Sequence, residues 1–113
     1  MGESYSILVV QPIDLVRAFK LDFCFASVIK WLTKWHMEKK TEYLTRAKYY
    51  INLCDNTENP MGLLFSLRMY CILNGFMKKD SQSCFLMDVC ILILKGDKDS
   101  ANYLLLKGWA DEH

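Results

Sequence analysis

Helical periodicity is strongest between residues 22 and 36, and it constrains the fold of this chain more than any other feature. Apolar and aromatic side chains recur there at steps of three and four residues, which places them on one face of a helix: Phe25, Val28, Ile29, Leu32, Trp35 and His36. Asp22 stands just before them and is a good N-cap residue. The pattern predicts a helix whose one face enters a hydrophobic core.

Further helices are predicted on both sides of this one. Pro12 suits a first helical position because its missing N–H would have no partner there. Apolar patterns and turn residues place the other elements at about 12–20, 41–54, 60–77, 84–94 and 99–108. The short run 5–10 (YSILVV) is rich in β-branched residues and offers a short N-terminal strand.

A single all-α domain over 1–113 is therefore the predicted fold class, as a compact bundle of five or six helices. Residues 12–54 form one helical half, and 60–108 form a more apolar half. The segments 60–77 and 84–94 are apolar nearly all round, and 113 residues leave little material to cover them. We therefore expect a homodimer that shares these two helices.

Net charge, cysteine use and segment length exclude several classes of protein. A formal net charge of +1 argues against a strongly basic nucleic-acid binder and leaves nucleic acid only a local patch. The five cysteines are odd in number and contain no C-x-x-C, which favours reduced thiols in the cytoplasm over a disulfide framework. No apolar stretch reaches the roughly 20 residues of a membrane span, so we expect no membrane partner.

Catalytic signatures are missing from the sequence. It contains no G-x-x-x-x-G-K-[ST], no G-x-G-x-x-G, no H-E-x-x-H and no nucleophile elbow. The sequence contains two histidines, His36 and His113. Neither stands near a carboxylate and a nucleophile in the pattern of a catalytic triad. The sequence thus predicts no catalytic residue, no metal ligand and no cofactor.

A basic and aromatic surface is the best candidate for a site. It combines cations that can neutralise phosphate or carboxylate with aromatic faces that can stack: Lys30, Trp31, Lys34, His36, Lys39, Lys40, Arg46 and Tyr49. Such a surface fits a host protein or a nucleotide ligand, since Trp and Arg are also common at interface hot spots. The alternative is ordinary, with Trp35 in the core, Trp31 at its border and the lysines as a solvated face.

Asp88 interrupts the apolar run 84–94, where a buried carboxylate would need a partner. Arg68, on the neighbouring apolar helix, is the natural candidate. We predict a structural ion pair between Arg68 and Asp88 that fixes the register of the two helices.

Residues 12–52 resemble the SaV-like family of uncharacterised bacteriophage proteins. The matching segments read PIDLV at 12–16, LDF at 21–23, VIKW at 28–31 and YLTRAKYYI at 43–51, with Lys34 also matched. The chain departs from the family at 34–39 (KWHMEK), where relatives have an Arg-x-Gly-Lys turn, and everything after Asp55 lies outside the resemblance. Some relatives carry a nucleotide-kinase label, which implies phosphate handling near Lys30, Lys34 and Arg46.

The resemblance implies a small phage accessory protein working in the cytoplasm of an infected bacterial cell. We expect it to bind and neutralise a host factor, as an anti-defence or host-takeover inhibitor, through the basic and aromatic surface. The target is either a protein or a nucleotide signal. The alternative is a small enzyme of nucleotide-kinase or nucleotide-hydrolysing type.

Overall fold

The chain folds into α-helices joined by short connections. The computed structural model describes residues 8–54, 60–78, 80–81 and 83–111. Within these ranges it contains α2 (Pro12–Phe19), α3 (Phe23–Glu38), α4 (Thr41–Ile51), α5 (Pro60–Leu73), α6 (Phe85–Leu94) and α7 (Lys98–Asp111) and no strand. The all-α fold class is thereby confirmed. The strand predicted at 5–10 lies mostly outside the described residues, and residues 8–10 form none.

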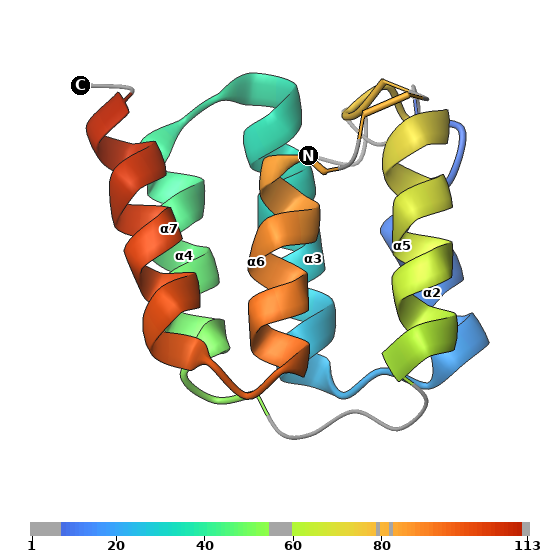
Figure 1. The fold of residues 1–113 in the computed structure, drawn as a ribbon, viewed down its shortest axis with the longest axis horizontal. Coiled ribbons are helices and arrows are strands. Elements are labelled where there is room, and N and C mark those ends of the chain that lie inside the picture. Colours follow the sequence, from blue (N-terminus) through green and yellow to red (C-terminus); the bar gives the residue numbers. More distant parts are fainter. Residues whose placement is uncertain (1–7, 55–59, 79, 82, 112–113) are drawn as a thin grey trace.

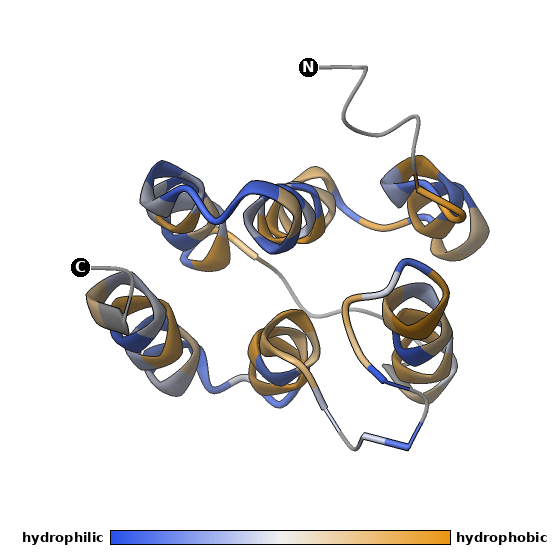
Figure 2. Cartoon of the chain, turned by 90° about the horizontal axis from the view of Figure 1, so that it is seen from above, coloured by the Kyte–Doolittle hydropathy of each residue, from blue (hydrophilic) through white to orange (hydrophobic). Residues whose placement is uncertain are grey.

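The six helices form two layers of three (Figures 1 and 2). One layer contains α2, α3 and α4, and the other contains α5, α6 and α7. Across the interface α2 packs on α5, α3 on α6 and α4 on α7. The more apolar half of the sequence is thus a layer of its own, and the core lies between the two layers.

Two helix starts follow the predicted local chemistry. Pro12 opens α2, and the Asp14 carboxylate accepts a hydrogen bond from the Gln11 N–H at 2.9 Å. Asp22 caps α3 by accepting from the backbone N–H groups of Cys24 at 2.8 Å and Phe25 at 3.1 Å. These bonds satisfy amides that have no partner inside the helix, and they confirm Asp22 as an N-cap.

Helix α3 is the middle of its layer and contacts α2, α4 and α6. It is therefore buried on more than one face, with these residues inside the molecule: Phe25, Ser27, Val28, Ile29, Trp31, Leu32, Thr33, Lys34 and Trp35. The Thr33 hydroxyl donates to the Ile29 carbonyl at 2.7 Å and shares a 2.7 Å hydrogen bond with the Tyr70 hydroxyl of α5. This polar contact ties the two layers together inside the core.

Helix α5 is apolar on two opposite faces. Leu63, Leu67 and Tyr70 are buried against the rest of the bundle. Apolar side chains also recur at four-residue steps on the outward face of the helix, and they are exposed. The fractional exposure is 76% for Met61 and 69% for Phe65. A single copy of the chain thus leaves an apolar stripe of α5 in contact with solvent.

Candidate functional site

Trp31 lies between α3 and α4 rather than on an open surface. Its ring stacks on Tyr43 of α4, with centroids 5.8 Å apart, and only 8% of the residue is exposed. Lys30 Nζ and the Arg46 guanidinium carbon each lie 4.8 Å from the centroid of the Trp31 ring. The expectation that Trp31 turns a free face outward is therefore wrong, because α4 covers it and two cations lie against it.

Lys34 is fully buried, which corrects the prediction that it belongs to an exposed basic surface. Its Nζ lies 3.6 Å from Oε2 of Glu38, one helical turn further along α3, and 5.3 Å from the ring centroid of Tyr43. A lysine is rarely buried without a compensating charge. Lys34 lies outside the apolar repeat of α3, so the sequence pattern assigns it to the polar face of the helix. It is buried because α3 is the middle helix of its layer and α4 covers that face.

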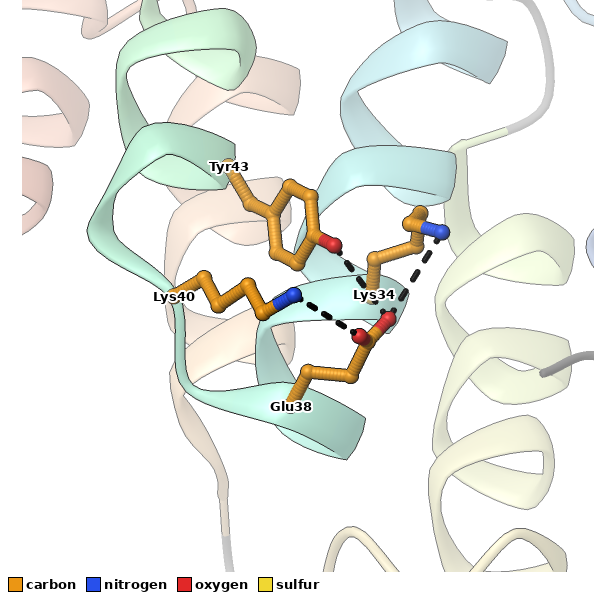
Figure 3. Close-up of polar contacts among 4 residues, drawn as sticks. All are labelled: Lys34, Glu38, Lys40 and Tyr43. Atoms are coloured by element: carbon orange, nitrogen blue, oxygen red, sulfur yellow. Dashed lines mark hydrogen bonds and ion pairs between the residues drawn. The ribbon is translucent and has the colours of Figure 1, made fainter. Parts of the chain in front are cut away.

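Glu38 is the centre of a small polar network (Figure 3). One carboxylate oxygen contacts Lys34 and accepts a hydrogen bond from the Tyr43 hydroxyl at 3.3 Å, and the other lies 3.6 Å from Lys40 Nζ. Burial raises the pKa of Glu38, but the charges of Lys34 and Lys40 and the Tyr43 hydrogen bond outweigh it, so the pKa is lowered overall. The network thus holds the carboxylate ionised beside the buried ammonium.

A pocket of about 420 Å³ opens beside Trp31, between α2, α3 and α4. Its walls are mainly apolar and come from Gln11, Pro12, Ile13, Val16, Phe23, Ala26, Ser27, Lys30, Trp31 and Tyr50. Phe23 and Ile13 are 73% and 54% exposed. A concave apolar site with a few polar groups is the usual form of a binding pocket.

Lys30 and Arg46 supply positive charge next to this pocket. Both are exposed, and neither belongs to an ion pair among those found in the part of the chain that the structure describes. Lys30 also lines the pocket itself. The two cations therefore remain available to a negatively charged group on a partner.

His36 and Lys39 lie away from the pocket. Nε2 of His36 accepts a hydrogen bond from the Leu86 N–H of α6 at 3.2 Å, and the His36 ring stacks on Phe76. Lys39 Nζ lies 3.7 Å from the ring centroid of Trp35. The His36 contacts join α3 to the second layer, and Lys39 lies over a ring of its own helix, so the structure does not place either residue with Lys30 and Arg46.

Lys40 and Tyr49 are exposed but occupy different places. The Lys40 side chain is 58% exposed and pairs with Glu38. Tyr49 is 64% exposed and meets Tyr50 edge to face, with centroids 5.1 Å apart. Since Tyr50 lines the pocket, Tyr49 adds an exposed ring near its α4 wall.

Arg68 and Asp88 do not form the predicted ion pair, which is not among those found for the described residues. Arg68 Nη1 donates to the Ser81 carbonyl at 3.1 Å. Asp88 is half-buried and hydrogen-bonds the Ser83 side chain; burial raises its pKa more than that bond lowers it. Both groups thus have partners in the segment before α6. An ion pair between Arg68 and Asp88 therefore does not fix the register of α5 and α6.

Residues of the pocket other than Lys30 and Trp31 were not predicted as a site. Ala26 and Ser27 are small residues that lie in the pocket wall opposite α2. Phe23 follows the Asp22 cap directly and falls outside the repeat of buried residues in α3. A large apolar residue off the buried face of a predicted helix was the available signal for this site.

Within the described residues no group of three or more His, Cys, Asp or Glu side chains is placed to hold a metal ion. None of the helices there has the length and apolarity needed to span a membrane. Comparison of the chain with protein-family models, with curated proteins and with solved structures found no match.

Proposed function

We propose that this protein acts by binding a host factor, and that the pocket between α2, α3 and α4 receives the partner. The observation that carries the proposal is the apolar pocket flanked by Lys30 and Arg46, two exposed cations that no described carboxylate neutralises. An apolar hollow supplies affinity through burial of the partner's side chains. The cations would select a partner that carries acidic residues beside its apolar ones.

A protein segment suits this pocket better than a nucleotide. Of its lining residues only Lys30 is charged, whereas a phosphate chain needs several donors or a helix N-terminus that faces it. The N-terminus of α3 is near, since Phe23 lines the pocket, but the Asp22 carboxylate already occupies the amides of Cys24 and Phe25. Trp31 is also stacked against Tyr43 and gives a base no free face.

The resemblance of residues 12–52 to phage proteins supports the choice of a host protein as the target. Neutralisation by binding requires a complementary surface and no catalytic group. The partner we propose is therefore a bacterial protein that presents an apolar segment flanked by Asp or Glu, held in the cytoplasm of the infected cell.

The test is capture of a partner from bacterial lysate by four variants of the full chain. K30E/R46E reverses both cations, and A26W fills the pocket without changing charge. The matched controls are K95E/K107E, which reverses two exposed lysines elsewhere, and A18W, which adds the same ring at an exposed site of α2. The proposal predicts that both test variants weaken binding of one bacterial protein at least about tenfold, while both controls retain it.

Two results would contradict this proposal. Equal capture by A26W and A18W would show that the pocket is not the binding site. Turnover of nucleoside phosphates with Mg²⁺ by the purified chain would instead support the enzymatic alternative. Added salt should weaken the captured complex, because exposed charges are screened at high ionic strength.

Self-association through α5 is the second interaction that we propose. Its outward stripe is formed by Met61, Phe65, Met69 and Leu73, at the four-residue spacing of one helix face. Because much of the stripe is exposed in one copy, pairing with a second copy would bury it. Sedimentation of F65E should show loss of a dimer, and Y103E, which places Glu at a similarly exposed ring on α7, should not.

A further inference from the structure

The pocket between α2, α3 and α4 opens where the chain enters α2. Gln11, Pro12 and Ile13 belong to its wall, so the start of the helix and the residue before it form part of the rim. The Gln11 side-chain amide also donates to the Leu8 carbonyl at 3.5 Å. Leu8, the first described residue, therefore lies within one hydrogen bond of a residue that lines the pocket.

Two further hydrogen bonds hold this entry point in place. The Val10 N–H donates to the side-chain oxygen of Asn74 at 3.0 Å, and the Asn74 side-chain nitrogen donates to the Val10 carbonyl at 2.9 Å. Asn74 directly follows α5, so these bonds tie residue 10 to the second layer. The point at which residues 1–7 join the bundle is thus fixed beside the pocket.

The sequence of residues 3–7, ESYSI, alternates in chemistry. Successive side chains of an extended chain point to opposite sides. An extended conformation would therefore place Glu3, Tyr5 and Ile7 on one side and two serines on the other. One side of this segment combines an aromatic ring, an aliphatic side chain and a carboxylate.

The two apolar side chains of the segment match the wall of the pocket. This wall is mainly apolar, and both Ile13 and Phe23 leave more than half of their surface exposed. Tyr5 and Ile7 would cover that surface, and apolar area on both sides of the contact would leave water. The pocket thus offers these side chains the burial that an exposed position denies them.

The length of the chain lets the carboxylate reach the positive charges. Glu3 stands five positions before Leu8, and an extended chain advances about 3.3 Å per residue, so the two residues can lie up to roughly 17 Å apart. Lys30 Nζ and the Arg46 guanidinium carbon each lie 4.8 Å from the ring centroid of Trp31 on α3, the helix next to α2. Neighbouring packed helices are only about 8–10 Å apart, so the segment can cross the pocket and bring Glu3 to these cations.

We propose that residues 3–7 of this chain occupy the pocket in an extended conformation, with their two apolar side chains on its wall and Glu3 beside Lys30 and Arg46. The segment is then an internal competitor of the partner, because it offers the same chemistry of apolar side chains next to a carboxylate. This competition, unlike the docking itself, rests on the proposed function of the pocket. The apparent affinity for the partner falls with the fraction of chains whose pocket is free.

The test places the photo-crosslinking amino acid p-benzoylphenylalanine at position 5 of the full chain. After irradiation we expect crosslinks within one chain to the pocket wall, above all to Ile13, Val16 and Phe23. The control carries the same group in place of Tyr103, an exposed ring on α7, and should leave these residues unlabelled. Crosslinks from position 5 to other surfaces, or none to the wall, would overturn the proposal. Crosslinks between a heavy-isotope-labelled and an unlabelled chain would also overturn it, because the occupant would then be a second copy.

A measurement on the wild type keeps the proposal testable if the foreign side chain does not fit the pocket. Nuclear Overhauser contacts between the Tyr5 ring and the methyl groups of Ile13 or Val16 report the same docking. We expect these contacts in the wild type. Their absence would overturn the proposal.

Charge reversal tests the position of Glu3 in the chain that carries the crosslinker. E3K should lower the yield of crosslinks to the wall at least about threefold, because it sets a cation beside Lys30 and Arg46. Adding K30E/R46E to E3K should recover most of the yield, since the charges are then exchanged. D99K, the matched reversal of an exposed carboxylate on α7, should not change it. A yield that E3K leaves unchanged would overturn the proposed position of Glu3.

Partner binding separates this inference from the proposed function. Y5S/I7S removes the two apolar side chains and should raise the affinity for the captured bacterial protein at least about threefold. S4A/S6A, on the other side of the extended segment, should leave the affinity unchanged. Equal or lower affinity of Y5S/I7S would overturn the competition. If no partner is captured, the proposed function fails, while the crosslinks still decide whether the segment occupies the pocket.

Discussion

Lys34 and Glu38 are one turn apart on α3, and their side chains meet with Nζ 3.6 Å from Oε2 although Lys34 is fully buried. The ammonium stays inside because Glu38 is reachable at the edge of the core, with its side chain 29% exposed. The aliphatic stem fills core volume next to Tyr43. Lys34 is therefore a packing residue with a compensated charge, which leads to two predictions.

The first prediction is that shortening Lys34 destabilises the fold. Lys34→Ser removes buried stem atoms and leaves a cavity, so we expect a loss of about 2–4 kcal/mol in the free energy of unfolding. Lys34→Met preserves the stem and removes the charge, and should change stability by less than about 1.5 kcal/mol. Lys30→Ser, at an exposed neighbour on the same helix, should stay within about 0.5 kcal/mol. Urea unfolding measures all three, and equal effects of K34S and K30S would contradict the burial of Lys34.

The second prediction is that Glu38 stabilises the fold at neutral pH and that this contribution is lost in acid. Because the pKa of Glu38 is lower in the folded chain than its usual value near 4.5, the unfolded chain binds more protons as the pH falls. The stability that Glu38 contributes is thus fully present above about pH 4.5. It is lost as the pH drops through the pKa that Glu38 has in the folded chain. Glu38→Gln has no such carboxylate, so it should be less stable than the wild type at neutral pH. The difference should shrink and vanish as the pH falls through the pKa of Glu38 in the folded chain. A difference that stays constant as the pH is lowered would exclude the ion pair as its cause.

Local signals in the sequence were sufficient for the fold class and for the position of each helix. Pro12 and Asp22 mark two helix starts that the structure shows at those residues. Gly96, with φ +80°, follows α6 in the left-handed conformation that glycine adopts readily. Such signals act within a few residues, and this is why they can be recognised without knowledge of the tertiary contacts.

The surroundings of side chains were predicted less well, because they depend on which helices become neighbours. Periodicity assigned α3 one buried face, but its place in the middle of a layer also buries Trp31 and Lys34. The pocket exists because α2 lies opposite Ala26 and Ser27 of α3. Contacts between residues as distant in sequence as His36 and Leu86 leave no local pattern.

The third prediction is a weak pH dependence of Cys84 alkylation. Interactions with Cys71 and His36 lower the pKa of Cys84, so its rate of reaction with iodoacetamide should rise less between pH 6 and pH 8 than that of an ordinary thiol. A thiol with the ordinary pKa of about 8.5 speeds up by roughly two orders of magnitude over that interval. Peptide mass spectrometry after short pulses of reagent gives the rate at each cysteine. A steep rise at Cys84 would show that it is protonated at neutral pH.

The last prediction is that Gly108→Ala destabilises the interface between α7 and α6, although alanine is the better helix former. A Cβ at position 108 would lie 3.0 Å from two ring carbons of Phe85, and that ring packs on Trp35 with centroids 4.6 Å apart, so it has little room to move. Overpacking costs about 1–3 kcal/mol, against a gain of about 1 kcal/mol in helix propensity. We therefore expect a net loss of about 1 kcal/mol by urea unfolding. In an F85L background, where the ring is gone, G108A should become stabilising. A stabilised G108A in the wild-type background would show that α7 and Phe85 are not in close contact.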